Sequence, residues 1–131
     1  LQPGKEPVQS CIRRVAGSEA ADGAAVGVMG GYMQPQGQIQ WLTTLVDRGM
    51  TPQQALDGPR WRYREDGSLA GETRLPSAVQ HGLLRRGHDV AVLPPRLFGG
   101  AQFVRARAVG TEETVLEGAT EPRKDGVAVG F

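Results

Sequence analysis

Apolar residues at spacings of three and four mark a helix in the first half of the chain. Residues 36–48 carry four of them, in the positions that one buried helical face needs. Gly49 follows directly, and a left-handed glycine commonly ends a helix. The pattern therefore predicts a helix over residues 36–48. Its predicted core positions are Ile39, Leu42, Leu45 and Val46.

Two shorter helices are predicted further along the chain. Thr51, Pro52 and Gln54 have the order of an N-cap, a first-turn proline and a capping-box glutamine. A third helix is predicted over residues 77–86, and Gly87 ends it. The predicted inward positions of this third helix are Val79, Leu83 and Leu84.

Asp-Gly pairs indicate tight turns, because both residues tolerate the positive φ angles of a hairpin. The pair at Asp22 and Gly23 lies between the apolar residues 12–16 and 24–29, which predicts a hairpin. A second pair at residues 66–67 joins residues 61–63 to 68–69, and a third at residues 125–126 precedes residues 127–131. Further strands are predicted over residues 89–93, 101–109 and 114–117. Strands and helices without a strict βαβ alternation predict an α+β fold, with antiparallel hairpins packed on about three helices.

Composition narrows the class of protein. The 131 residues fit one domain, since domains most often have about 100–150 residues. Cys11 is the single cysteine, so a disulfide-rich secreted scaffold is excluded. No apolar run approaches the roughly 18 residues of a spanning helix, so an integral membrane protein is not expected. Fifteen basic and fourteen acidic residues leave a net charge of +1, which gives no electrostatic reason to expect binding to nucleic acid or a membrane surface.

Residues 27–37 hold the most informative candidate chemistry. Gly30 and Gly31 follow a predicted strand, and a helix begins a few residues later. Adjacent glycines let backbone N–H groups face a ligand without side chains in the way, and a helix N-terminus adds partial positive charge. This arrangement would stabilise a developing oxyanion. A plain strand-to-helix turn explains the same residues.

Other reactive side chains match no local signature. Ser10 and Cys11 lack a nucleophile-elbow pattern, and His81 and His88 lie far along the chain. One cysteine and two histidines without close ligand spacing predict no metal site. Neither a phosphate loop nor a dinucleotide fingerprint is present, so no cofactor is expected.

Arginines alternate with aromatic residues over residues 60–64. The simplest interpretation is an aromatic core face with Trp61 and Tyr63 and a basic solvent face with Arg60. Alternatively, Arg60 directly after a Gly-Pro pair anchors a loop carbonyl or a carboxylate.

Four ordered motifs carry a resemblance to a known family. Residues 3–7 read Pro-Gly-Lys-Glu-Pro, residues 27–37 contain Gly-Gly-Tyr-Met-Gln-Pro-Gln-Gly, residues 55–61 read Ala-Leu-Asp-Gly-Pro-Arg-Trp, and residues 120–126 read Thr-Glu-Pro-Arg-Lys-Asp-Gly. With these motifs the chain resembles, over essentially its whole length, the C-terminal part of the γ-glutamyltransferase (glutathione hydrolase) family. The bacterial branch that carries Gly-Gly-x-Met-Gln-Pro-Gln-Gly is the most similar.

The resemblance implies an N-terminal-nucleophile hydrolase fold, a four-layer α-β-β-α sandwich made as a precursor that cuts itself. The new N-terminal threonine of the small subunit attacks a γ-glutamyl amide and forms an acyl-enzyme, which water or an acceptor amine releases. Carried onto this chain, Gly30 and Gly31 match the family's oxyanion-hole glycines. Gln9 and Ser10 fall where the family has a hydroxyl or His-Thr pair that holds the substrate's α-carboxylate.

The sequence departs from the family pattern in three places. It begins downstream of the nucleophilic threonine, so residues 1–131 are expected to be a single domain, the C-terminal portion of a longer protein, without the nucleophile segment and the large subunit. Residues 9–14 lack the expected His-Thr and the proline after it. Glu121 stands where the family has aspartate in Asp-Pro-Arg.

Two hypotheses follow. In the first, the chain is part of an amide hydrolase or transferase, inactive alone, whose partner is the rest of the same precursor or a second copy and whose substrate is a small γ-glutamyl or related amide. In the second, it is a non-catalytic remnant or binding domain that keeps the fold. A fragment of a four-layer sandwich is also expected to expose apolar sheet surface that its missing half would cover.

Overall fold

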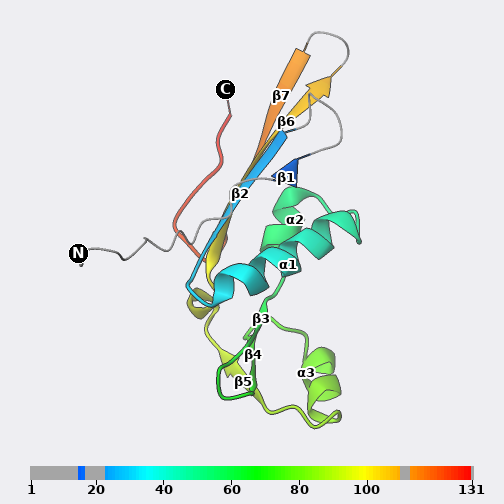
Figure 1. Ribbon diagram of the computed structural model, residues 1–131, viewed down its shortest axis with the longest axis vertical. Helices are drawn as coiled ribbons and strands as arrows, with labels where there is room; N and C mark the ends of the chain where they lie inside the picture. Colours follow the sequence, from blue (N-terminus) through cyan, green and yellow to red (C-terminus); the bar gives the residue numbers. More distant parts are fainter. Residues whose placement is uncertain (1–14, 17–22, 110–112, 131) are drawn as a thin grey trace, which may run out of the picture.

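The computed structural model describes residues 15–16, 23–109 and 113–130, which form two β-sheets and three α-helices (Figure 1). The larger sheet is four-stranded and antiparallel, in the order β1-β2-β6-β7. The smaller sheet has the order β3-β4-β5, with β3 antiparallel and β5 parallel to β4. The strands are β1 (Val15–Ala16), β2 (Gly23–Met29), β3 (Trp61–Tyr63), β4 (Leu69–Glu72), β5 (Val90–Leu93), β6 (Gly100–Val109) and β7 (Glu113–Thr120).

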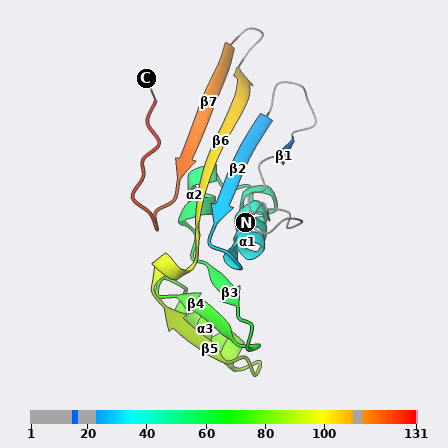
Figure 2. The ribbon, with the colours of Figure 1, turned by 60° about the vertical axis from the view of Figure 1, so that its left-hand side comes forward.

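The helices are divided between the two sheets. Helices α1 (Met33–Val46) and α2 (Pro52–Asp57) lie together on one face of the larger sheet, whereas α3 (Ser77–Leu84) connects the parallel strands β4 and β5 (Figures 1 and 2). A 3-10 turn, η1 (Pro95–Leu97), leads from the smaller sheet into β6. The predicted α+β class is confirmed.

The apolar core lies between the larger sheet and its two helices. Val26 and Val28 of β2 and Phe103 of β6 point to this face, because alternate residues of a strand share a side. Trp41 of α1 packs edge-to-face against Phe103, with ring centroids 6.0 Å apart. Leu56 of α2 completes the core and is 1% exposed.

Helix α1 buries a different row of residues from the one predicted. Its buried positions are Met33, Gly37 and Trp41, while Ile39 and Val46 are 60% and 65% exposed. A Cβ at Gly37 would lie 3.1 Å from Val28 Cγ1, so glycine allows the helix to approach β2 closely. The spacing of the large apolar residues predicted the wrong buried face, because the row of α1 that packs against the sheet contains a glycine. Leu42 and Leu45 are partly buried against the core, as predicted.

The inward face predicted for α3 is also largely wrong. Val79 and Leu84 are exposed, Leu83 is half-buried, and Gly82 is the buried residue of the helix. The helix stop was predicted correctly, since Gly87 has a φ of +84°. Gly49 after α1 is likewise left-handed, with a φ of +60°.

Two predicted hairpins are confirmed by strand pairing. β1 pairs with β2, but Gly23 is already the first paired residue of β2, and Asp22 lies outside the described residues. The turn between β3 and β4 contains Gly67 with a φ of +83°. Ser68 donates to the Asp66 carboxylate from its hydroxyl and its amide at 2.6 and 3.0 Å, and these bonds lower the pKa of Asp66. Residues 127–130 after the third Asp-Gly pair form no strand.

The other face of the larger sheet is open. Met29, Val104 and Leu116 are 55%, 46% and 71% exposed there. The C-terminal segment crosses part of this face, because a Cβ at Gly118 would lie 3.2 Å from Ala128 Cβ. Within the described part of the chain, no helix combines the length and apolar character that crossing a lipid bilayer requires.

Candidate functional site

Gly30 and Gly31 form the turn between β2 and α1. Both are left-handed, with φ angles of +125° and +56°, and both are exposed. Their carbonyl groups accept from the amides of Met33 and Gln34 at 3.0 and 2.9 Å, which fixes the start of the helix. Their own amides donate no hydrogen bond among the described residues. The turn therefore presents two backbone donors at a helix N-terminus that no side chain caps.

A second glycine pair, Gly99 and Gly100, lies directly against the first. Strand β6 begins here, and Gly100 pairs with Met29 at the end of β2. A Cβ on Gly30 would lie 2.8 Å from Gly99 Cα, and a Cβ on Gly99 would overlap the Met29 carbonyl oxygen. The two backbones approach so closely that neither position accepts a side chain.

The remaining predicted site residues are not brought to this turn. Gln9, Ser10 and Cys11 lie outside the described residues. His81 in α3 and His88 after it are exposed, in the connection between strands β4 and β5 of the smaller sheet. Among the described residues, no group of three or more histidine, cysteine, aspartate or glutamate side chains is placed to hold a metal ion.

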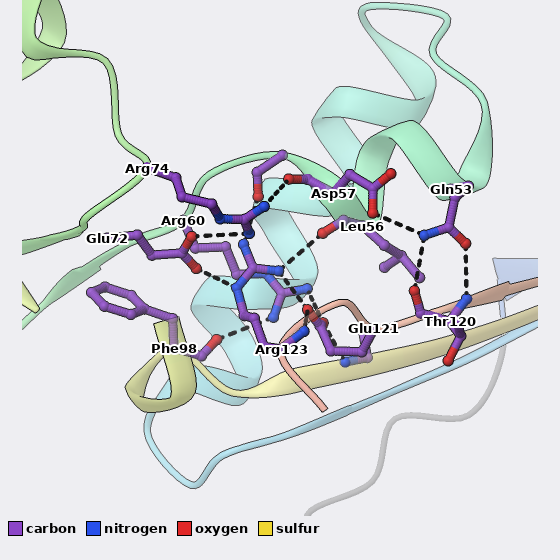
Figure 3. A network of polar contacts seen from close by, with 12 residues as sticks. Gln53, Leu56, Asp57, Arg60, Glu72, Arg74, Phe98, Thr120, Glu121 and Arg123 are labelled. Carbon is purple, nitrogen blue, oxygen red and sulfur yellow. Dashed lines mark hydrogen bonds and ion pairs between the residues drawn. The ribbon is translucent and has the colours of Figure 1, made fainter. Parts of the chain in front are cut away.

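Four charged side chains are buried beside the second glycine pair (Figure 3). They come from the connection after α2, the end of β4 and the segment after β7. They therefore connect the smaller sheet to the larger sheet. Two arginines face two carboxylates, which makes the group electrically neutral. We call them the buried ion network: Arg60, Glu72, Glu121 and Arg123.

Arg60 and Glu121 hold the start of β6. Arg60 Nη1 donates to the Phe98 carbonyl at 3.1 Å, and its Nη2 donates to Glu121 Oε2 at 2.7 Å. The same carboxylate oxygen accepts from the Ala101 amide at 2.8 Å. β7 ends at Thr120, so Glu121 supplies from its side chain the acceptor that a longer strand would have supplied from its backbone.

Arg123 holds the connection between α2 and β3. Its guanidinium donates to the carbonyls of Leu56 and Gly58 at 3.0 and 2.6 Å and forms ion pairs with Glu72 and Glu121. Arg74 adds a half-exposed partner to Glu72 at 3.2 Å. The two buried arginines thereby donate to three backbone carbonyls at this junction, those of Leu56, Gly58 and Phe98.

The pKa values of the two buried arginines shift in opposite directions. Burial, followed by the charge of Arg123, lowers the pKa of Arg60 despite its contact with Glu121. Burial also disfavours the charge of Arg123, but the hydrogen bonds that it donates to Glu72 and Glu121 outweigh burial and raise its pKa. Both guanidinium groups remain charged, because arginine is not deprotonated in proteins.

The simpler interpretation of residues 60–64 is wrong. Trp61 and Tyr63 are 43% and 58% exposed, whereas Arg60 is 2% exposed. The alternative is confirmed, since Arg60 anchors both a loop carbonyl and a carboxylate. Sequence reasoning missed Glu72, which lies in β4 without a motif around it. It also missed Gly99 and Gly100, the second of the two Gly-Gly pairs in the chain, because no local pattern relates this pair to the first.

Comparison with known proteins places the chain in a family. All of residues 1–131 match the model of the gamma-glutamyltranspeptidase family. An oxamate amidohydrolase proenzyme from Klebsiella pneumoniae is 34% identical over 138 residues, which cover 100% of this chain and 25% of that protein. A glutathione hydrolase-like YwrD proenzyme from Bacillus subtilis is 32% identical, with coverage of 100% and 26%. The chain therefore spans about a quarter of the length of these curated relatives.

Solved structures share the fold. A cephalosporin acylase from Bacillus halodurans is 41% identical with a TM-score of 0.69, over 79% of this chain and 19% of that one. The transpeptidase CapD from Bacillus anthracis has a TM-score of 0.80 at 21% identity, over 99% of this chain and 75% of that one. These likenesses confirm the predicted N-terminal-nucleophile hydrolase fold. Because the family model matches the whole chain, the chain belongs to the gamma-glutamyltranspeptidase family.

Proposed function

We propose that the chain is the C-terminal portion of a γ-glutamyltransferase-like amide hydrolase or transferase and that its Gly30-Gly31 turn is the oxyanion hole. The observation that carries this proposal is the pair of adjacent left-handed glycines at the start of α1, whose backbone amides donate no hydrogen bond among the described residues. Backbone donors of this kind stabilise charge that develops on a carbonyl oxygen during acyl transfer.

The proposed reaction uses a threonine hydroxyl supplied from upstream of residue 1. The hydroxyl oxygen attacks the amide carbonyl carbon, its proton passes to the departing amine, and the carbonyl oxygen becomes an oxyanion that the two glycine amides bind. Collapse of this intermediate breaks the C–N bond and leaves an acyl-enzyme, which water or an acceptor amine then cleaves. Gln9 and Ser10 remain predicted contacts of the substrate carboxylate.

The substrate class is a small amide. The curated relatives are named for oxamate and for glutathione, and a solved relative for cephalosporin. These names share one chemical feature, an amide or lactam-bearing acyl compound of low molecular weight. We propose that γ-glutamyl and oxamate-type amides are the first compounds to test.

The exposed face of the larger sheet supports the proposal that another chain or segment packs against it. Met29, Val104 and Leu116 form an exposed apolar surface opposite the core. We propose that the rest of the same precursor, or a second copy, covers it. In sedimentation velocity the isolated chain should associate or aggregate. A stable monomer at all concentrations would contradict this part of the proposal.

A matched pair of glycine variants tests the oxyanion hole in the full-length protein. Gly31 and Gly49 have nearly equal φ angles of +56° and +60°, and a Cβ at either meets no atom within 4 Å. Alanine at either position therefore carries the same left-handed strain, about 1–2 kcal/mol. Only Gly31 lies at the proposed site.

We expect Gly31→Ala to lower kcat for release of a chromogenic amine by at least about tenfold. Alanine keeps the backbone N–H, but relief of its left-handed strain turns the amide away from the oxyanion, and complete loss of one such donor costs about 10²–10³ in kcat. Gly49→Ala should lower the melting temperature by about as much as Gly31→Ala does, and it should keep kcat near the wild-type value. Equal kcat values in the two variants would contradict the oxyanion assignment. A full-length protein inactive on every amide tested, although it folds, would favour the non-catalytic binding domain instead.

A further inference from the structure

The backbone of Gly99 and Gly100 separates the buried ion network from the Gly30-Gly31 turn. Gly99 is in van der Waals contact with Gly30 and with the Met29 carbonyl, so the position of one glycine pair determines that of the other. A Cβ at Gly99 would also lie 3.4 Å from the Cβ of Met33, the first residue of α1. A displacement of residues 98–101 would therefore move the turn and its amides directly.

Glycines cannot hold this segment in place by themselves. Gly99 has a φ of +73°, and neither it nor Gly100 has a side chain to pack. A Cβ at Gly100 would lie 2.9 Å from Lys124 Cγ and 3.2 Å from Glu121 Cγ, so the segment after β7 covers this glycine closely. The position of the glycine pair therefore depends on its strand pairing with Met29 and on its flanking residues, Phe98 and Ala101.

Both flanking groups are fixed by the network. Arg60 holds the carbonyl of Phe98 on one side of the glycine pair, and Glu121 holds the amide of Ala101 on the other. Arg60 and Glu121 are bonded to each other at 2.7 Å and are 2% and 1% exposed. The two bonds therefore form a closed clamp around Gly99 and Gly100, shielded from solvent (Figure 3).

We propose that Arg60 and Glu121 are positioning residues, which hold residues 98–101 against the Gly30-Gly31 turn and thereby fix the direction of its amides. This inference rests on the proposed function of that turn. Neither side chain touches the turn, so neither is a catalytic residue. The clamp acts through the backbone of Gly99, and its contribution belongs to the transition state, where donor direction matters most.

Three arginine-to-lysine variants in the full-length protein separate positioning from stability. Lysine cannot reproduce the planar fork with which arginine reaches two acceptors together. Arg60→Lys disturbs the clamp. Arg123→Lys disturbs the same network but acts on the carbonyls of Leu56 and Gly58 and on Glu121 Oε1, whereas the clamp bonds use Glu121 Oε2. Arg74→Lys changes a half-exposed partner of Glu72.

We expect Arg60→Lys to lower kcat by at least about tenfold with KM within about threefold of wild type, because a small misplacement of a reacting group is costly. Arg123→Lys should lower the melting temperature at least as much as Arg60→Lys does but keep kcat within about threefold of wild type. Arg74→Lys should change neither the melting temperature nor kcat. Hydrogen exchange should be faster in Arg60→Lys alone at the amides of Met33 and Gln34, which donate to the Gly30 and Gly31 carbonyls and so report on the turn.

The outcomes distinguish the two proposals. If kcat falls in Arg60→Lys and Arg123→Lys in proportion to their melting temperatures, the clamp is only structural and the inference is overturned. If Gly31→Ala loses activity while Arg60→Lys keeps it, the inference alone fails. If both keep wild-type kcat, the oxyanion assignment fails as well. Should Arg60→Lys not fold, Glu121→Gln carries the same comparison, because it weakens the bonds of this side chain to Arg60 and to the Ala101 amide with little change in size.

Discussion

The two buried regions of this molecule are built from opposite chemistries. Between the larger sheet and helices α1 and α2, the core consists of apolar side chains such as Val28, Leu56 and Phe103. At one end of the same sheet, the buried ion network consists of two arginines and two glutamates bonded to one another and to backbone carbonyls. Strand β6 contacts both regions, since its Phe103 lies in the core and its Ala101 amide donates to Glu121.

The difference shows what each region can tolerate. Apolar packing depends on volume and area, so a side chain of similar size replaces another at modest cost. A buried ion network depends on direction and on complete pairing, because each charge left without a partner keeps its full desolvation cost. The core therefore stabilises the sheet, while the network fixes where particular backbone atoms lie.

Removal of one charge should produce the largest effect. Glu72 is 0% exposed and accepts from both Arg123 and Arg74. Glu72→Ala leaves a buried guanidinium underpaired, and we expect a loss of about 3–5 kcal/mol in the free energy of unfolding of the full-length protein. Glu65→Ala, at an exposed turn position, should stay within about 0.5 kcal/mol. Denaturant unfolding measures both, and a loss below 1 kcal/mol in Glu72→Ala would show that the network adds little.

Near-isosteric replacements sharpen the contrast. Glu72→Gln keeps the shape of the side chain but removes its charge, and hydrogen bonds to charged groups contribute about 1.5–3 kcal/mol. Leu56→Met, at a core position that is 1% exposed, should cost less than about 1.5 kcal/mol. We expect the glutamate variant to be the less stable of the two in the same unfolding measurement. The reverse order would mean that the apolar core is the more specific region.

Elements with local signals could be predicted from the sequence. The capping box of Thr51 and Gln54, the left-handed Gly49 and the Asp66-Gly67 turn each depend on residues a few positions apart. The family resemblance added the fold and the oxyanion glycines, and the family and fold are confirmed. The oxyanion role of Gly30 and Gly31 remains a prediction.

Features that depend on distant partners could not be predicted. Arg60 and Glu121 are 61 positions apart, and neither position has a local pattern that names the other. The alternation of Arg60 with Trp61 even favoured the opposite burial, because the pleat of a short strand says which residues share a face but not which face is covered. The buried row of α1 was missed for a related reason, since Gly37 contributes closeness to Val28 and not apolar area.

The smallest effect should come from the capping box, which is neither apolar nor buried. Thr51 Oγ1 accepts from the Gln54 amide at 3.3 Å, and Gln54 Oε1 accepts from the Thr51 amide at 3.0 Å. Thr51→Ala should therefore cost about 1 kcal/mol of stability. Thr43→Ala removes a threonine from inside α1, where its hydroxyl donates to the Ile39 carbonyl at 2.9 Å. Because alanine is the better helix former, this control should cost nothing. Equal losses in the two variants would mean that the cap contributes no more than an ordinary exposed hydroxyl. The start of α2 would then depend on the pair of hydrogen bonds between Gln53 and Thr120, which ties this helix to the end of β7.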